Sequence, residues 1–493
     1  MDFTMCLIVI AAIYLVLLFF DTFFKTCAHY PYVQFLKNTG VEIGLFRLKW
    51  NTTFFNRIIL RMGSSRTRML YYWFELGLYI SLALLPVAVA LLIIANCQLF
   101  FSSSSTSPDQ NKPVLEPLIP GFNLPTSEIG YYAIALLLCS VVHEFGHALA
   151  AVKEDVHLID MGMNIFLFLP VAFVNISSEK LSAISQWRIL RILCAGVWHN
   201  VVLMLGAGLL YLSLPFVMSP FYNTNTGVIV TDILPKSHLT GLRGLEVNDV
   251  ITKINDCQIS DDLSWQHCLS QARIVKPGYC INTDLAHELD ETGPFVQLAS
   301  GAWDCCAPNS PTHMCFEYLE QSEGAVELRQ HICLPARKIV EESKSHCYLE
   351  TRRCPEPYHC IRPLLANDTS LIVISRNAKQ NVVYVGHPAD IFMTVEVSSF
   401  IPKYTLPSTT IATSLNKMLR YITVFSGGLA VVNILPCIFF DGQHIMNALS
   451  MILFRNRCER QTISTVSGVA TILGSLMLLI NFIYSMWTFI FRM

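Results

Sequence analysis

The 493-residue sequence is short of charged residues. Asp, Glu, Lys and Arg make up 14% of it, against ~25% in an ordinary soluble domain, and the formal net charge is only -2. A charge so close to zero argues against a direct nucleic-acid partner. Hydrophobic residues instead reach 53%, and the mean hydropathy is +0.46. This composition predicts a polytopic α-helical membrane protein.

Long apolar runs supply the expected spans. Five runs are long enough to cross a membrane, which takes ~20 residues; they cover residues 3–20, 79–101, 131–151, 192–218 and 463–490. A sixth, 421–440, carries Asn433 and Pro436 but no charge. We therefore expect about six spans. The first run is a cleaved signal peptide or a retained anchor, and its missing basic start favours the anchor.

The cysteine-rich part of the chain has no C-x-x-C motif. Ten of the 17 cysteines nevertheless lie close together, at positions 257, 268, 280, 305, 306, 315, 333, 347, 354 and 360. The alternatives are disulfides in an oxidising lumen or a zinc ribbon, and the missing paired motifs favour disulfides.

The spans and loops suggest five regions. They are N-terminal spans with a basic loop (1–101), a Ser-rich linker (102–129), a first membrane core (130–218), a large extramembrane insert (219–419) and a second membrane core (420–493). Residues 157–176 are apolar but interrupted by Asp160, Gly162 and Pro170, so they fit a membrane-dipping hairpin as well as a helix.

Basic loops predict the orientation. If the insert is luminal and 155–185 does not cross, the basic segments 25–69 and 455–460 are cytosolic, as the positive-inside rule requires. Two glycosylation sequons bear on this topology. Asn367 lies in the luminal insert and is the better candidate, whereas Asn51 falls in the loop assigned to the cytosol.

One expected span contains the segment VVHEFGHALA, residues 141–150. On a helix, His143 and His147 lie on one face and can bind one metal ion, while Glu144 can act as a general base. Two satisfied core histidines beside an interfacial glutamate are the alternative. Three costly polar groups within one turn of an apolar span argue against that alternative.

A hydrolytic zinc site needs a third protein ligand and one open position. Asp441 is the best candidate, because it ends the uncharged stretch TVFSGGLAVVNILPCIFF. His444 is a second candidate, and Glu75 looks interfacial. The alternative for Asp441 is a helix cap or a turn residue before Gly442.

These motifs carry a family resemblance. His143-Glu-Phe-Gly-His147 in one span, followed by Asn433-Ile-Leu-Pro436 and Asp441-Gly442 in a later one, resembles the site-2 protease family of intramembrane zinc metalloproteases. The order of the motifs and the insert between them are similar too. Ile438 and Phe440 depart from the family's second motif, at positions that concern packing. The serine run at 102–107 and the Cys-rich insert are similar to those of animal members.

The resemblance implies roles for single residues. His143, His147 and Asp441 would bind one Zn²⁺ per chain, Glu144 would activate the water, and Asn433 would help hold the substrate. Residues 195–200 (AGVWHN) resemble another family stretch. Asn200 there contacts the site or substrate, or else bonds another helix. His199 is a weaker candidate ligand, and Cys437 is a packing residue rather than a fourth ligand.

The insert begins with short β-rich runs between Gly and Pro turn signals in residues 227–257. It resembles the family's PDZ-like domain; an unrelated small β domain is the alternative. The Cys-rich stretch 261–360 interrupts it, and strands near 371–374 and 382–385 complete the fold. We expect this domain to filter substrates by the size of their luminal part.

The resemblance also implies the biology. The enzyme would lie in the lipid bilayer of the Golgi as a multi-pass protein, with its active site toward the cytosol. It would cut single-pass transcription factor precursors, such as sterol regulatory element-binding proteins and an ER-stress activator, after a first luminal cut. Two alternatives stay open. A prenyl-protein endopeptidase would place a glutamate where Asp441 stands, and a zinc transporter or luminal receptor would not need Glu144.

Overall fold

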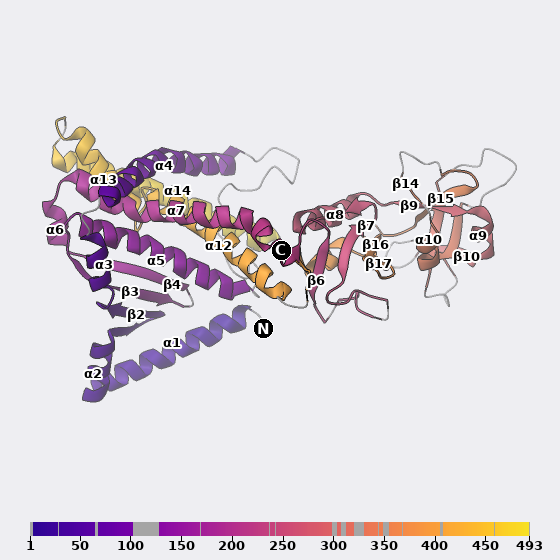
Figure 1. Ribbon diagram of the computed structural model, residues 1–493, viewed down its shortest axis with the longest axis horizontal. Coiled ribbons are helices and arrows are strands. Elements are labelled where there is room, and N and C mark those ends of the chain that lie inside the picture. Colours follow the sequence, from indigo (N-terminus) through magenta and orange to yellow (C-terminus); the bar gives the residue numbers. More distant parts are fainter. Residues whose placement is uncertain are drawn as a thin grey trace. The chain divides into compact units, whose positions relative to one another are not determined.

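The computed structural model describes most of the chain. The described residues are 3–27, 29–64, 68–101, 128–167, 169–235, 237–241, 243–297, 303–306, 312–319, 330–343, 345–348, 354–366, 368–404, 408–457 and 459–492. They form two compact units, each described below by itself. Unit 1 comprises 1–212 and 416–493, and unit 2 comprises 213–415 (Figure 1). Asn367 and residues 102–127 of the expected linker lie outside the described residues.

Long helices dominate unit 1. They are α1 (Phe3–Thr26), α4 (Arg68–Phe101), α5 (Ile129–Lys153), α7 (Gln186–Met218), α12 (Thr409–Ile434), α13 (Asp441–Phe454) and α14 (Arg460–Arg492). Within the described residues, five helices are long and apolar enough to cross a membrane: α1, α4, α5, α7 and α14. The chain therefore has the character of a polytopic membrane protein.

The sixth apolar run does not form one continuous helix. Helix α12 ends at Ile434, and α13 begins only at Asp441. Pro436 cannot donate a helical hydrogen bond, and the backbone turns back with Phe439 at φ +74°. The freed backbone finds local partners: the Cys437 amide donates to the Leu435 carbonyl at 2.7 Å, and the Ile438 amide to Ser475 Oγ at 2.8 Å. The break places Asp441 at the first position of a new helix.

A four-stranded antiparallel sheet lies beside α5 (Figure 1). Its strands, in spatial order, are β1 (Val41–Gly44), β2 (Arg47–Thr52), β3 (Leu158–Phe166) and β4 (Leu169–Ile176). Of the two alternatives for 157–176, the structure shows the hairpin. Short helices α2 (Tyr30–Thr39), α3 (Asn56–Gly63) and α6 (Ser178–Ala183) connect these elements. Tyr14 of α1 donates hydrogen bonds to the Ile165 and Leu167 carbonyls at the hairpin tip.

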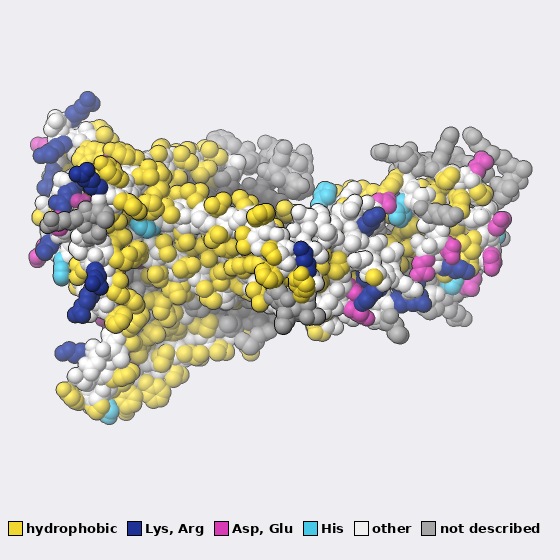
Figure 2. Space-filling view, viewed as in Figure 1, with side chains coloured by type: hydrophobic (Ala, Val, Ile, Leu, Met, Phe, Trp, Pro, Cys, Tyr) yellow, Lys and Arg dark blue, Asp and Glu magenta, His cyan; other side chains and the backbone are white. Residues whose placement is uncertain are grey.

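Charge gathers at one end of unit 1. Figure 2 shows apolar side chains over the helices and Lys and Arg at the end where α3, α6 and α13 lie in Figure 1. Ion pairs join the helices there: Arg188 Nε lies 2.5 Å from Glu154 Oε2, and Arg191 contacts both Glu154 and Glu75. A charged end and an apolar body are typical of a membrane-embedded unit.

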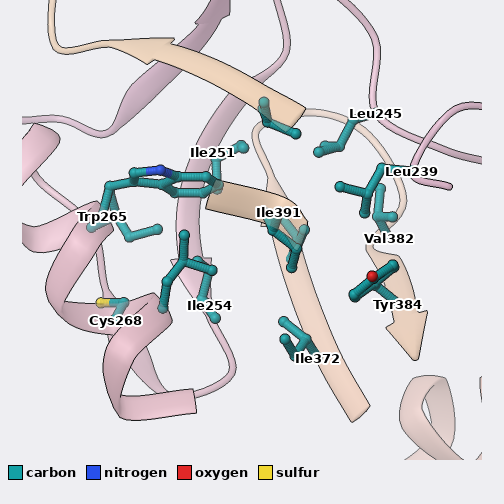
Figure 3. Close-up of a cluster of buried hydrophobic side chains, with 14 of the residues drawn as sticks. Leu239, Leu245, Ile251, Ile254, Trp265, Cys268, Ile372, Val382, Tyr384 and Ile391 are labelled. Atoms are coloured by element: carbon teal, nitrogen blue, oxygen red, sulfur yellow. The ribbon is translucent and has the colours of Figure 1, made fainter. Parts of the chain in front are cut away.

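Unit 2 contains two larger sheets, and the first of them belongs to a small β domain. Strands β17 (Val382–Gly386), β16 (Ser370–Arg376), β7 (Val250–Ile254), β6 (Val228–Ile233) and β18 (Val395–Ser398) follow one another in space, and β8 (Cys257–Gln258) pairs with β7. Helices α8 (Asp262–Ile274) and α11 (Pro388–Thr394) belong to it. Figure 3 shows Trp265 of α8 packed with Ile251 and Ile254 of β7 in the buried core.

The second sheet carries most of the disulfides. Its strands are β13 (His331–Pro335), β12 (His313–Tyr318), β15 (Tyr358–Pro363), β9 (Gly278–Asn282) and β14 (His346–Cys347), with helices α9 (Thr283–Glu288) and α10 (Ala336–Glu342). Two-stranded pairs complete the unit: β10 (Thr292–Gln297) with β11 (Trp303–Cys306), and β5 (Tyr222–Asn223) with β19 (Ile401–Pro402).

The ten clustered cysteines form five disulfides, which confirms the prediction over the zinc ribbon. The pairs are 257–268, 280–354, 305–315, 306–333 and 347–360. The expected insertion, 261–360, begins too early. Helix α8 packs into the first sheet's core and is tied to it by Cys257–Cys268, so the second sheet starts at β9.

Candidate metal centre

Three side chains from distant parts of the sequence meet in unit 1. His143 and His147 come from α5, one turn apart, and Asp441 comes from the start of α13. Their ligand atoms form a nearly regular triangle. His143 Nε2 lies 2.9 Å from Asp441 Oδ2, His147 Nε2 lies 3.1 Å from the same oxygen, and the two Nε2 atoms are 3.1 Å apart. Both imidazoles are buried and Asp441 is half-buried.

This triangle fits a zinc ion. Zn–N and Zn–O bonds of ~2.0–2.1 Å in a tetrahedral site place ligand atoms ~3.3 Å apart, within a few tenths of an ångström of the triangle. Two nitrogens and one carboxylate oxygen are also a donor set that zinc accepts, and three protein ligands leave a fourth position open. Among the described residues outside the disulfides, this is the only such group of potential ligands.

Helix α7 approaches the imidazoles through glycine. A Cβ atom at Gly196 would lie 2.3 Å from His147 Nε2 and 2.7 Å from His143 Nε2. Contacts below 3.0 Å essentially never occur for real Cβ atoms, so a side chain here would displace the ligands. A second glycine, Gly146 on α5, lets that helix approach the Ala195 carbonyl of α7. Small residues at this helix interface therefore make room for the site.

The far nitrogens of both imidazoles have partners. His147 Nδ1 lies 2.8 Å from the Ile192 carbonyl, so it carries the proton and leaves the Nε2 lone pair for a metal. His143 Nδ1 lies 3.1 Å from the side-chain amide nitrogen of Asn200. In this orientation the buried Asn200 Oδ1 has no partner among the described residues. Rotating the amide by 180°, which exchanges its O and N, gives His143 an acceptor and the same tautomer as His147.

Glu144 sits beside the ligands without joining them. Its Oε2 accepts a hydrogen bond from the Val174 amide of β4 at 3.0 Å. A carboxylate on the same helical turn as two metal ligands is placed to serve as a base rather than a ligand. One turn earlier, Ser140 Oγ accepts a hydrogen bond from the Ala172 amide at 2.8 Å.

Other candidates fall outside the metal group. Glu75, within α4, pairs with Arg191. His199 Nδ1 lies 2.7 Å from the carbonyl of Ala195, and its ring faces Trp73 and Phe74. His444 is not among the grouped ligand atoms. Cys437 is buried in the apolar cluster between α4, α7, α12 and α13, and Asn433 lies in the last turn of α12, half-buried.

Some residues of the site gave no clear signal in the sequence. Gly196 acts through close approach, Ile192 through its backbone carbonyl, and Ser140 through a side-chain hydrogen bond to a backbone amide. Gly196 stands in the AGVWHN stretch, where only its small size inside a span hints at a helix contact.

Comparisons with known proteins agree with this geometry. A model of peptidase family M50 matches residues 131–477, which include both motifs of the metal group. A curated protein of Arabidopsis thaliana, the membrane-bound transcription factor site-2 protease homolog, is 24% identical over 451 residues. That alignment covers 80% of this chain and 83% of the relative. Because the family model spans well over half of the sequence, the chain belongs to peptidase family M50, the site-2 protease family of membrane metalloproteases.

Proposed function

We propose that this chain is a zinc endopeptidase that cleaves peptide bonds within transmembrane segments of other proteins. The observation that carries the proposal is the meeting of His143, His147 and Asp441 beside Glu144, on helices of a unit built to sit in a membrane. A metal carrier has no use for a carboxylate base next to its ligands, whereas a hydrolase requires one.

The substrates we propose are membrane-anchored transcription factor precursors. The support is the name of the Arabidopsis relative, a site-2 protease homolog for membrane-bound transcription factors. Sterol regulatory element-binding proteins and an ER-stress activator are the expected examples. A first protease trims each precursor in the lumen, and this Golgi enzyme then releases the cytosolic domain.

Each residue has one task in this scheme. His143, His147 and Asp441 would hold the zinc ion, which when bound would supply a Lewis acid for the scissile carbonyl and for the attacking water. Glu144 takes a proton from the attacking water and passes it to the leaving amine. Ile192 and Asn200 fix the imidazole tautomers, and Asn433 orients the substrate chain. The enzyme must also unwind the substrate helix, because a helical peptide bond is shielded and internally bonded.

Unit 2 is proposed to act as the PDZ-like size filter of this enzyme in the lumen. Its first sheet, with helices α8 and α11, provides a compact folded body inserted in the chain between α7 and α12. We propose that it admits only substrates whose luminal domain has been removed.

The test compares three proteins at matched expression in cells that lack the endogenous enzyme. The substrate is a luminally trimmed, single-span reporter, and bound zinc is measured by mass spectrometry on the purified proteins. We expect Glu144→Gln to keep zinc but to lose at least ~100-fold in released fragment, because a general base contributes roughly 10²–10⁴-fold. We expect Asp441→Asn to lose both the bound zinc and the release of the fragment. Continued cleavage by Glu144→Gln would refute the protease mechanism and bring a transport or receptor role forward.

A further inference from the structure

Two disulfides of the second sheet in unit 2 lie against each other. Cys280–Cys354 and Cys347–Cys360 belong to one cluster. The sulfur atoms of Cys280, Cys347 and Cys354 all lie within 4.8 Å of one another, and no other three described cysteines are grouped in this way. Gly278 of β9 makes room for them, because a Cβ atom there would lie 2.9 Å from Cys347 Sγ and 3.1 Å from Cys360 Sγ. The two bonds therefore share one small space beside β9.

The strand register offers these cysteines a second pairing. Cys280 of β9 lies directly opposite Cys360 of β15 in their antiparallel pair. The Cys280 amide donates to the Ser345 carbonyl at 3.1 Å, and the Cys360 carbonyl accepts from the Leu319 amide at 3.0 Å, so both groups point away from the facing strand. Such a non-hydrogen-bonded pair holds its Cα atoms ~4.5 Å apart, which is within the range that a disulfide spans. Each of the two cysteines is nevertheless bonded to another partner.

We propose that these four cysteines form a thiol–disulfide exchange site. At this site a small monothiol converts the pairs 280–354 and 347–360 into the pairs 280–360 and 347–354. A small thiol suits the site because Cys354 is half-buried and the other three cysteines are buried. The proposal concerns unit 2 alone and does not rest on the protease function.

The exchange runs in three steps that each pass a thiolate to the next sulfur. The thiolate of the small molecule attacks Cys354 Sγ, forms a mixed disulfide there and releases the Cys280 thiolate. Cys280 then attacks Cys360 Sγ, which forms the 280–360 bond and releases the Cys347 thiolate. Cys347 finally attacks Cys354 Sγ, which forms the 347–354 bond and returns the small thiolate. Two disulfides break and two form, so the exchange consumes neither oxidant nor reductant.

The exchange changes how β14 is held. His346 and Tyr348 flank Cys347 and reach the first sheet: His346 Nδ1 lies 2.6 Å from Asp256 Oδ1, and the Tyr348 hydroxyl donates to the same carboxylate. Asp256 lies in the turn between β7 and β8. The observed Cys347–Cys360 bond ties this segment to β15. In the second pairing that tie is lost, and β14 keeps only its backbone pairs with β9. The exchange site therefore controls how firmly the two sheets are joined.

Free-thiol mapping of one variant is the first test. Cys354→Ser leaves Cys280 as a free thiol beside the Cys347–Cys360 bond. We expect Cys280 to capture Cys360 and to leave Cys347 free. The full-length protein in detergent is unfolded in the presence of N-ethylmaleimide, and labelled peptides are identified by mass spectrometry. Compared with wild type, the extra label should appear on Cys347. Extra label on Cys280 would refute the exchange.

The matched control is Cys268→Ser, which releases Cys257 in the core of the first sheet. That core contains no second disulfide among its described residues, so the extra label should stay on Cys257.

The wild-type protein gives a readout that does not depend on a variant. It is incubated in a mixture of reduced and oxidised glutathione, trapped with N-ethylmaleimide and digested without reduction. Peptides linked 280–360 and 347–354 should appear beside those of the observed pairs, while 257–268 should stay as it is. The observed pairs alone after the incubation would overturn the proposal.

Hydrogen exchange tests the effect on β14. The double variant Cys347→Ser/Cys354→Ser leaves the other two cysteines to pair and reproduces the loss of the tie to β15. The Cys280 amide, which donates to the Ser345 carbonyl just before β14, should exchange roughly tenfold faster than in wild type, as expected when about one hydrogen bond's stability is lost. The Val230 amide of the first sheet is the control and should be unchanged. Equal exchange at Cys280 in the two proteins would show that the disulfide does not control β14.

Discussion

At the scale of single residues, the candidate metal centre depends on the free volume beside the two imidazoles as much as on the ligand atoms themselves. The imidazoles of His143 and His147 converge on Asp441 because α7 presents hydrogen atoms rather than a side chain to them at Gly196. A methyl group there would occupy the volume of the ligand atoms themselves. Close packing in interiors leaves little freedom to absorb such an overlap.

Gly196→Ala should therefore lose the metal. We expect at least a roughly tenfold drop in zinc retained through purification, because the ligand triangle must open to relieve the clash. Gly206→Ala is the matched control on the same helix, since a Cβ at Gly206 would meet no atom within 4 Å. Zinc content by mass spectrometry distinguishes the two, and equal zinc in both would show that α7 does not limit the site.

Asn200 is predicted to act on the metal through His143. Asn200→Ala removes the partner of His143 Nδ1, and outer partners of this kind typically change metal affinity by roughly 10–100-fold. We expect a loss in that range in competition with a zinc chelator. Asn96→Ala serves as the control, because Asn96 is buried on α4 and bonds within its own helix, to the Leu92 carbonyl. Unchanged zinc affinity in Asn200→Ala would leave Asn200 as a substrate residue or a helix contact.

The sequence was enough to select the three candidate ligands that the structure brings together, but not the groups that support them. His143 and His147 share a helix face by spacing alone, and Asp441 follows an uncharged run, so the cost of polar groups in an apolar span is enough to select them. The Ile192 carbonyl and the Ser140 hydroxyl have no such signature. Any residue at 192 supplies a carbonyl, and a serine in a span is common. Their roles depend on which helices and strands become neighbours.

At the scale of elements, the sequence predicted where a helix or strand is interrupted better than it predicted which of the two forms. Asn433 and Pro436 indicated an interruption, and α12 does end at Ile434. The hairpin of β3 and β4 was one of two alternatives, because Asp160, Gly162 and Pro170 break a helix and a strand pattern alike. Its sheet also recruits β1 and β2 from the basic loop 25–69, a pairing between distant parts of the sequence that no local pattern encodes.

Within unit 2, the first sheet is predicted to be sensitive to acid through Asp249. Burial alone would raise the pKa of this carboxyl, but hydrogen bonds from Lys379 and Arg376 outweigh burial and hold the pKa below its usual range. A carboxyl whose pKa is lowered by folding stabilises the fold above its unfolded pKa of ~3.9, and that stability is lost as the pH falls through the folded pKa.

Acid proteolysis of the full chain tests this prediction. Susceptibility of unit 2 to pepsin should rise as the pH falls below ~4 in wild type. At neutral pH, unit 2 of Asp249→Asn should be less stable than that of wild type, because Arg376 stays buried without its charged partner. Its stability should then fall less than that of wild type when the pH is lowered. The exposed Asp232→Asn is the control and should follow wild type. An Asp249→Asn curve parallel to wild type would show that another group governs the acid response.

At the scale of the whole molecule, the order of the chain connects unit 2 to the metal centre. Unit 2 is inserted between α7, which carries Gly196 and Asn200, and α12, which leads to Asp441. Composition predicted an insert of this length, since the apolar runs stop near 218 and resume near 421. The boundary between the two folded parts of the insert was less predictable. Helix α8 lies within the Cys-rich stretch of the sequence but packs with β7 of the first sheet. Disulfide connectivity was beyond the sequence altogether, since ten cysteines can pair in many ways.

The same covalent order makes the size filter testable in the intact membrane protein. Replacing residues 219–408 by a flexible Gly/Ser linker keeps α7 and α12 whole and removes the folded body between them. If unit 2 excludes bulky luminal domains, this variant should cut uncut and luminally trimmed precursors at similar rates, whereas wild type should cut only the trimmed form. Zinc content equal to wild type is the control for an intact metal centre. A variant that retains zinc and cuts trimmed precursors, yet still rejects uncut ones, would place the selectivity in the membrane unit.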